Sequence, residues 1–231
     1  MLSTATQIRA LEQMRERFKL TEYPEKVSGK PSCFALNDYT FMKYLQEHDF
    51  NVDKAESALN KLLDWRRTVR PEELSWNVEG LRRETVIMGK SKLGHPVLFA
   101  RLGRWSPSMY SLDTYMKSRT LEMEESRREM ARDGWKVDRL IVINDMSGYS
   151  VFNHASYHGL KQAQILMFIF GVAYPRSVEV IYLLNAPIMF QTFWGWVKRY
   201  TENDVLRRIR FVNDQSTLHE LIDEDQMFVN M

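Results

Sequence analysis

Residues 173–200 read AYPRSVEVIYLLNAPIMFQTFWGWVKRY, and two elements of different periodicity meet in this stretch. Residues 178–184 form a Val/Ile-rich run that is typical of a buried strand, and Asn185 follows it. Because proline fits the first turn of a helix, Pro187 predicts a helix over 187–200. The stretch therefore predicts a buried strand that leads directly into a very apolar helix.

The predicted helix carries two rows of apolar side chains, which cover more than the roughly 100° stripe that packing against a core requires. One row can face the core, whereas the second needs another apolar partner: a protein, a bilayer interface, or a ligand held between helix and sheet. A helix that is simply buried on two sides is the alternative. The first row contains Met189, Phe193, Trp196 and Tyr200, and the second contains Phe190, Trp194 and Val197.

Further strand signals lie on both sides of this stretch. Residues 96–102 and 137–144 are strand-like runs, and residues 209–212 form a weaker one. Helical patterns over 111–132 and 155–172 separate them. Strands that alternate with helices of this length form βαβ units, so the sequence predicts an α/β fold with a parallel or mixed sheet.

The N-terminal part of the chain shows helical patterns and no strand signal. Apolar residues recur at helical spacing over 6–19 and 53–67, and Asn37 is placed to cap another helix between them. We therefore predict a helical N-terminal lobe over 1–85 and a sheet-containing lobe over 86–231.

Charge and cysteine content narrow the function. The 231 residues contain 32 Lys plus Arg against 30 Asp plus Glu, a net charge of +2, which disfavours nucleic acid as a partner. The single cysteine, Cys33, excludes an internal disulfide and a thiolate metal cluster, and it fits a reducing compartment. The chain is also rich in soft apolar residues, with 13 Met and 12% aromatics.

Two apolar runs, 163–174 and 180–197, could suggest a membrane span. The first is shorter than the roughly 20 residues that a span needs, and polar residues and a proline break the second. Residues 1–10 are too polar for a secretory signal. We therefore predict a cytoplasmic protein that touches membranes transiently and peripherally.

Familiar catalytic motifs are missing from the sequence. It contains no G-x-S-x-G elbow, no phosphate-binding loop and no dinucleotide fingerprint. Asp145 and Ser147 follow the strand at 137–144, where we expect a turn in which their side chains satisfy backbone donors. A small serine hydrolase that uses Ser147 or Ser150 with His154 is a minor alternative.

Metal and carboxylate chemistry find little support. His154 and His158 are four residues apart, but no third ligand lies at helical spacing, so we expect one to cap a helix and the other to be solvated. We predict no metal and no cofactor. Interleaved acids and bases over 111–132 predict a solvated, ion-paired helix face. These residues are Glu122, Glu124, Glu125 and Glu129, with Arg119, Arg127 and Arg128.

Four motifs in a fixed order resemble the CRAL-TRIO lipid-binding family. They are YLQEHDFNVDKAESALNKLLDWRR (44–67), GHPVLFARLG (94–103), VINDMSGYS (142–150) and the stretch 173–200. The resemblance implies a helical N-terminal lobe and an α/β lobe that encloses one deep apolar pocket, closed by a gate helix over 187–200. It also implies a monomer that binds one lipid or lipid-like molecule and exchanges or presents it between membranes without catalysis.

The resemblance, together with the apolar pattern, suggests which residues bind the ligand. Ser150 matches a hydroxyl that contacts phosphocholine headgroups in related proteins. Val205 and Arg208 align with a Thr and Lys pair of members that bind phosphatidylinositol. Changes elsewhere, such as Arg176 in place of an acid, predict that the usual inositol headgroup recognition is absent. The residues expected to line or close the pocket are Phe99, Arg101, Ile143, Phe168, Ile181, Leu183, Met189, Phe193 and Tyr200.

The outer row of the gate helix and the cations at its end are expected to touch the membrane. The second interpretation is a protein-interaction adaptor with a vestigial pocket and a Trp-rich docking helix. The expected membrane-contact residues are Phe190, Trp194, Val197, Lys198 and Arg199.

Overall fold

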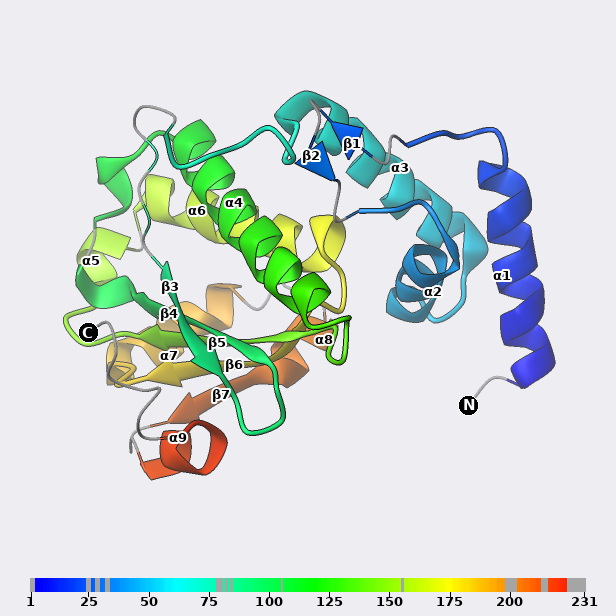
Figure 1. The fold of residues 1–231 in the computed structure, drawn as a ribbon. Helices are drawn as coiled ribbons and strands as arrows, with labels where there is room; N and C mark the ends of the chain where they lie inside the picture. The colour runs from blue at the N-terminus through cyan, green and yellow to red at the C-terminus, as the bar shows by residue number, and fades with distance from the viewer. Residues whose placement is uncertain are drawn as a thin grey trace.

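The N-terminal part of the protein consists of three helices. In a computed structural model, α1 (Thr4–Phe18), α2 (Asp38–Glu47) and α3 (Val52–Val69) pack against one another, apart from the sheet (Figure 1). The structure describes residues 3–23, 26–27, 30–31, 34–77, 81, 83, 85–104, 106–154, 156–197, 203–212 and 216–223.

Side-chain caps begin the second and third helices where the sequence predicts them. Asn37 accepts a hydrogen bond from the backbone amide of Thr40 at 3.2 Å, and Asn51 accepts one from Lys54 at 3.0 Å. Each cap satisfies one of the backbone amides that a helix leaves unpaired at its start. Helix α3 ends at Arg70, which adopts a left-handed conformation with φ 52°.

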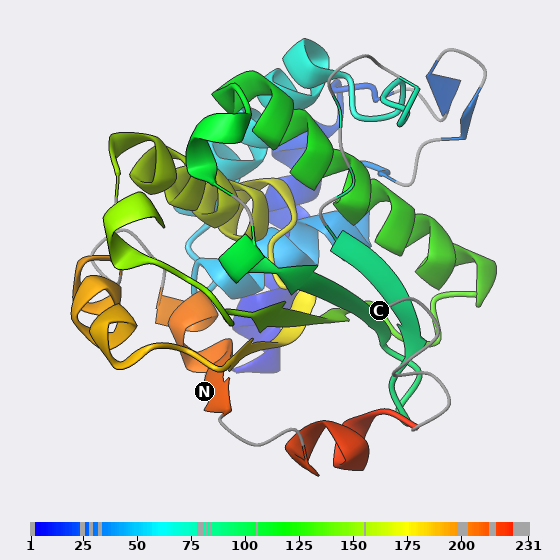
Figure 2. The same cartoon turned by 90° about the vertical axis from the view of Figure 1, so that its left-hand side faces the viewer.

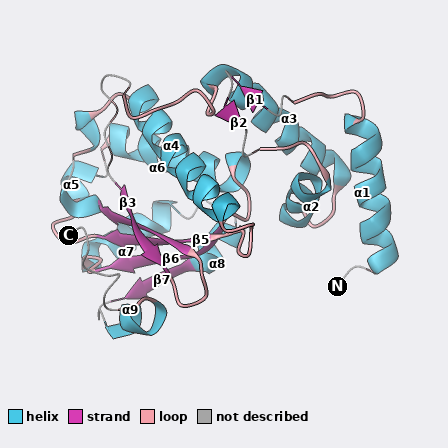
Figure 3. Cartoon of the chain, viewed as in Figure 1, coloured by secondary structure: helices cyan, strands magenta, loops and turns pink. Residues whose placement is uncertain are grey.

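Along the chain, a short antiparallel hairpin lies between α1 and α2. It pairs β1 (Lys26–Val27) with β2 (Lys30–Pro31) (Figure 3). The expectation that no strand precedes residue 85 is therefore wrong in this detail, because runs of two residues are too short to show alternation.

The central sheet has five strands in the order β3-β4-β5-β6-β7. The last four are mutually parallel, which confirms the predicted mixed sheet with crossover helices, while β3 pairs antiparallel to β4. The sequence analysis missed β3, where the register shifts between Ile87 and Gly89 and breaks the alternation. The strands are β3 (Thr85–Lys90), β4 (Pro96–Arg101), β5 (Leu140–Asp145), β6 (Val178–Leu184) and β7 (Ile209–Val212).

The crossovers place helices at defined positions around the sheet. Between β4 and β5 the chain forms η1 (Leu102–Arg104), η2 (Pro107–Met109) and α4 (Leu112–Arg132). The single helix predicted over 155–172 consists of α6 (Tyr157–Phe168) and the π-helical turn η3 (Ile169–Ala173), and the short helix α5 (Val151–His154) precedes it. The remaining helices are α7 (Ile188–Val197), α8 (Asn203–Arg208) and α9 (Ser216–Leu221).

The two faces of the sheet pack against different elements. Leu98, Val142 and Ile181 belong to the large core that also contains residues of α1 to α4, and Val97 belongs to a smaller core with Leu218 of α9. Figure 2 shows α9 on the other side of the sheet from α4 and α6. The large core is continuous between the N-terminal helices and the sheet. A boundary between two lobes near residue 85 therefore stays a prediction.

Helix α4 does not carry the solvated charged face that its sequence predicts. Glu124 is only 1% exposed, and it accepts hydrogen bonds from Arg66 and from the hydroxyl of Tyr174. Glu122 is also buried, where it pairs with Arg119. Interleaved acids and bases look alike in sequence whether water or the rest of the protein surrounds them, so this expectation is corrected.

Candidate functional site

A small apolar cavity lies between α6, the strand β6 and helix α7. Its volume is about 140 Å³. Helix α6 contributes Leu166, strand β6 contributes Ile181 and Leu183, and helix α7 contributes Phe190 and Trp194. No Asp, Glu, Lys or Arg is among the described residues that line it. A cavity with such walls suits uncharged, mostly hydrocarbon ligands.

Aromatic contacts hold α7 over this cavity. Phe190 meets Tyr149 edge to face, with 5.3 Å between ring centroids, and Trp194 meets Phe211 of β7 in the same way at 6.1 Å. Tyr149 in turn stacks on His154 at 4.1 Å, and burial raises the pKa of Tyr149 above its ordinary value. Such aromatic pairs are directional but individually weak. Aromatic packing therefore helps to hold α7 over the cavity, and the helix contains no charged residue that could form an ion pair.

The three described side chains of the two apolar rows of α7 are placed opposite to the sequence prediction. Phe190, expected to touch a membrane, is only 6% exposed, and Trp194 lines the cavity. Met189, expected to line the pocket, is 56% exposed. Both rows are apolar, so the helical wheel could not decide which of them faces inward; the structure corrects the assignment.

The structure separates the strand residues that the sequence analysis grouped together. Ile181 and Leu183 line the cavity, whereas Phe99 and Ile143 lie on the other face of the sheet, in the core formed with α9. Both faces of these strands are apolar, so alternation alone did not show which residues share a face. Phe99 and Ile143 therefore do not line the cavity, contrary to the sequence prediction.

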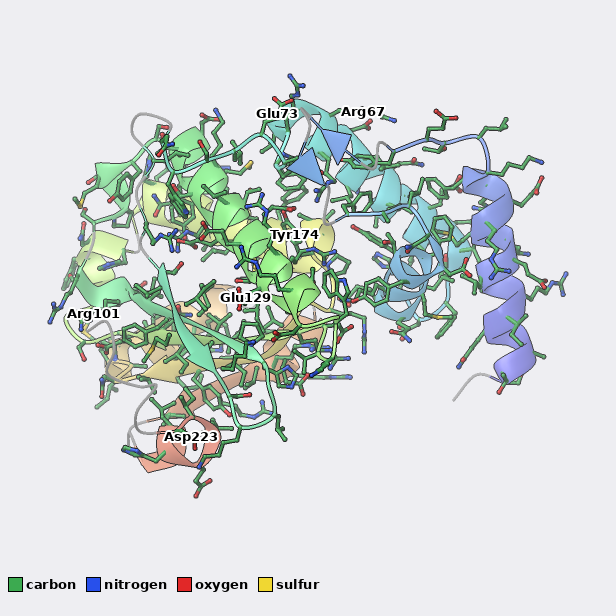
Figure 4. The ribbon with its side chains drawn as sticks, in the orientation of Figure 1. Arg67, Glu73, Arg101, Glu129, Tyr174 and Asp223 are labelled. Atoms are coloured by element: carbon green, nitrogen blue, oxygen red, sulfur yellow. The ribbon has the colours of Figure 1, made fainter. Side chains whose placement is uncertain are left out.

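Three further candidates lie near the cavity without lining it. Arg101 is the last residue of β4 and lies on the same face of the sheet as Phe99. The guanidinium carbon of Arg101 is 6.0 Å from the centroid of the Phe99 ring, and Figure 4 labels Arg101 at this end of the sheet. Ser150 precedes α5, where its carbonyl oxygen faces Nδ1 of His154 at 2.8 Å. Phe168 packs edge to face on Trp65 of α3 at 5.7 Å. The fold thus uses Phe168 to join the lobes.

Arg208 lies at a second and larger depression, of about 700 Å³, against the other end of the sheet. Its guanidinium donates to the carbonyl oxygen of Val178. Charged residues such as Lys92, Arg139 and Glu179 line this depression, so its walls do not suit a hydrocarbon chain. Arg208 and the apolar cavity are therefore separate features.

Some candidates cannot be placed. The side chains of Phe193 and Val197 in α7 and of Val205 in α8 lie outside the described part of the chain, as do Lys198, Arg199 and Tyr200 as a whole.

The predicted turn after β5 forms, but only Asp145 satisfies a backbone donor, because the hydroxyl of Ser147 pairs with the side chains of Asp145 and Asn185. Oδ1 of Asp145 accepts hydrogen bonds from the backbone amide of Ser147 at 2.9 Å and from its hydroxyl at 2.7 Å, and Asn185 donates to the same oxygen at 3.0 Å. Burial of Asp145 opposes its ionisation, but these hydrogen bonds hold its pKa below the ordinary value. The hydroxyl of Ser147 is thus directed at a carboxylate, an arrangement that gives no support to a serine nucleophile paired with His154.

The two histidines are not a metal pair. His154 ends α5 and presents its ring nitrogens to the carbonyl oxygens of Ser150 and Leu102, while Nε2 of His158 in α6 lies 2.7 Å from the carbonyl oxygen of Tyr110. Both rings therefore bind backbone, which corrects the expectation that one is a cap and the other solvated. Among the described residues, no group of three or more His, Cys, Asp or Glu is placed to hold a metal ion.

Sequence reasoning missed much of the cavity wall on α6. Gln162, Leu166 and Phe170 follow one another at spacings of four, on the face of α6 and η3 that meets the cavity. This helical spacing inside the run 163–174 was a usable signal. Tyr149, in the loop before α5, carried no such periodicity.

None of the described helices is both long and apolar enough to cross a bilayer.

Several curated proteins are similar to this chain in sequence. The phosphatidylinositol/phosphatidylcholine transfer protein SFH12 of Arabidopsis thaliana is 23% identical over 245 residues, covering 96% of this chain and 43% of its own length. The phosphatidylinositol transfer protein CSR1 of Eremothecium gossypii is 22% identical over 207 residues, covering 82% and 45%. The chain therefore spans less than half the length of these curated relatives.

The fold is also similar to a solved structure. The crystal structure of Sfh5 superposes with a TM-score of 0.75 at 15% sequence identity, covering 96% of this chain and 85% of that one. In sequence, residues 83–231 match the CRAL/TRIO domain. That match includes the whole five-strand sheet, the helices α4 to α9 and the cavity beneath α7, and on this evidence the chain belongs to the CRAL/TRIO domain family.

Proposed function

We propose that this protein binds one lipid or lipid-like molecule in the cavity beneath α7 and exchanges or presents it between membranes, without catalysis. The observation that carries the proposal is the uncharged, apolar cavity closed by a helix whose described contacts include the aromatic pairs of Phe190 and Trp194. The names of the relatives, which describe transfer of phosphatidylinositol and phosphatidylcholine, support the same class of ligand.

The size of the cavity implies that α7 moves when ligand enters. Its volume of about 140 Å³ lies well below the roughly 300–1,000 Å³ of typical ligand sites. A lipid chain therefore needs more room than the closed form offers. Outward movement of α7 would separate Phe190 from Tyr149 and Trp194 from Phe211, and it would break no ion pair of α7, which contains no charged residue. This makes α7 the gate in our proposal.

The surface at the cavity end of the sheet is largely uncharged apart from Arg101 and Arg104, and it supports membrane contact. No Asp, Glu, Lys or Arg occurs in residues 105–112, 146–160 or 180–197, although 27% of the chain is charged. These segments follow the carboxyl ends of β4 and β5 and include that of β6, which lie at one edge of a parallel sheet. The exposed large apolar side chains on them are Met109, Phe152, Tyr157, Ile188 and Met189.

Such a surface suits a neutral bilayer interface, because it offers exposed apolar side chains for insertion. Phe152 and Ile188 are 89% and 84% exposed, so both are free to insert without any rearrangement. In this proposal the membrane-contact surface consists of η2, α5 and the first turns of α6 and α7. A membrane at this surface would lie directly against the gate.

Native mass spectrometry of the full chain, followed by transfer between vesicles of a pyrene-labelled form of the lipid that it identifies, tests the function. We expect one bound lipid per chain and transfer that rises with protein concentration. A ligand-free protein that transfers nothing would contradict the proposal. If the same ligand-free protein also bound a specific protein through the exposed apolar residues of α7, the adaptor interpretation would replace it.

A further inference from the structure

Gln162 is a buried polar residue in the wall of the apolar cavity. It lies in the middle of α6 and is 2% exposed. Its Nε2 donates a hydrogen bond of 2.8 Å to the carbonyl oxygen of Pro107. Its Oε1 is buried and has no hydrogen-bond partner among the residues that the structure describes. An acceptor thus remains unused on a side chain that lines the proposed ligand site. Because this oxygen has almost no accessible surface in the closed form, a ligand group can reach it only when the cavity opens.

Chemistry fixes the orientation of this amide. A carbonyl oxygen only accepts hydrogen bonds, so the group that faces Pro107 must be the NH₂ of Gln162. Rotating the amide by half a turn would bring two acceptors together and lose the bond. The free position is therefore an acceptor, and it calls for a donor.

The rest of the cavity wall does not supply that donor. His154, the polar ring nearest in sequence, presents its two nitrogens to the carbonyl oxygens of Leu102 and Ser150. A buried acceptor without a donor costs free energy, and proteins keep few of them. A trapped water would need two to four polar partners to replace the donor, whereas most neighbouring lining residues are apolar.

We propose that the ligand of this cavity carries a free hydroxyl group that donates to Oε1 of Gln162. A charged donor such as an ammonium group does not fit, because none of the described lining residues is acidic. The ligand class is thus a neutral lipid with a hydroxyl among its apolar atoms, such as a long-chain alcohol. The inference rests on the proposed function and adds the identity of one polar group.

The selectivity expected from such a pair is large. When a site supplies an acceptor for a hydroxyl, an analogue without the hydrogen leaves that acceptor unpaired. The hydroxyl ligand should therefore bind about tenfold or more tightly than an analogue of similar size that lacks a donor.

The test compares two probes, 1-dodecanol and 1-methoxydodecane, by isothermal titration of the full chain below their solubility limits. We expect the alcohol to bind at least about tenfold more tightly than the ether. Gln162→Met removes the acceptor and keeps the length of the side chain, and it should bring the two affinities together. Gln164→Met is the matched control, because Gln164 is exposed on the same helix, and it should keep the preference.

Equal affinities in the wild type would overturn the inference and would indicate that a water molecule at most pairs with Oε1. A preference that survives in Gln162→Met would overturn it as well. The wild-type comparison decides the question even if Gln162→Met fails to fold. Failure of the proposed function is a different result, in which neither probe binds, no lipid is bound to the purified chain and no labelled lipid is transferred.

Discussion

Nη2 of Arg66, in α3, lies 3.1 Å from Oε1 of Glu124, in α4, and both side chains are 1% exposed. The same Oε1 accepts a hydrogen bond of 2.6 Å from the hydroxyl of Tyr174, a residue in the segment that leads into strand β6. Figure 4 shows Tyr174 between α4 and the N-terminal helices. Arg66 also pairs with Glu72. Burial of Glu72 opposes ionisation, but the charge of Arg66 holds the pKa of Glu72 below its ordinary value. One guanidinium thus joins the helical part to the sheet part.

Arg66→Met should therefore destabilise the protein strongly. Removing one partner of a buried ion pair leaves the other charge unpaired, which costs about 3–5 kcal/mol. Urea unfolding measures the free energy of unfolding. Arg67→Met is the matched control, because Arg67 is 63% exposed and pairs only with Asp64 three residues before it. A loss below about 1 kcal/mol in both variants would show that the buried cluster contributes little.

The order of elements was accessible from sequence, because periodicity and capping are local. Asn37 and Pro187 each predict the start of a helix, and both predicted starts agree with the structure to within one residue. The environment of each face was not accessible. Glu124 is buried because α3 supplies Arg66, a partner 58 positions away, and no local pattern reports such a partner.

Lys43 should make the stability of the protein depend on pH. Burial lowers the pKa of Lys43 to about 8, although Asp138, 3.3 Å away, opposes the shift. Below pH 8 both the folded and the unfolded chain hold this proton. Between about 8 and the ordinary 10.5, only the unfolded chain holds it, so stability rises with pH in that window.

The measurement is the free energy of unfolding of the wild type and of Lys43→Met at pH 7.0 and at about pH 9.5. The wild type should gain about 2 kcal/mol relative to the variant over this range. Lys54→Met, at an exposed position of α3, should show no such change. A constant difference between wild type and Lys43→Met would mean that Lys43 titrates near its ordinary value in the folded protein.

Gly103→Ala should disrupt the turn that follows β5. A Cβ atom on Gly103 would lie 1.9 Å from the carbonyl oxygen of Ser147, which is backbone and has little room to move. We expect a loss of about 3 kcal/mol in thermal or urea unfolding. Gly195→Ala is the control, because a Cβ atom there meets nothing within 4 Å and alanine favours helix α7. Equal stability of the two variants would contradict the close approach.

The wall of the cavity was only partly predictable, for a reason visible in particular residues. Ile181 and Ile143 are both apolar and both lie on central strands, yet only Ile181 faces α6 and α7. A strand buried on both sides carries no alternation that distinguishes its faces. Gln162 was missed because its importance depends on the carbonyl of Pro107, which the fold alone brings within reach.

Phe152→Glu should weaken attachment to neutral membranes without changing the fold. Phe152 is 89% exposed on the largely uncharged surface around the cavity end, and inserting it buries apolar area worth about 1.5–3 kcal/mol. Binding to phosphatidylcholine vesicles in a flotation assay should fall about tenfold. Leu93→Glu is the control, because Leu93 is 77% exposed in the turn between β3 and β4, away from that surface. If Leu93→Glu lowers binding equally, the docking surface is elsewhere.

Trp194 should report the arrival of ligand, because it lines the cavity while remaining half-buried. A hydrocarbon chain that replaces water beside the indole ring makes its surroundings less polar, so its emission should shift to shorter wavelength when 1-dodecanol binds. Trp194→Phe should lose this shift although it still binds the alcohol by titration. Trp76→Phe is the control, because Trp76 is also half-buried but donates to Glu125 at 2.7 Å and does not line the cavity. A shift that persists in Trp194→Phe and disappears in Trp76→Phe would place the ligand outside the cavity beneath α7.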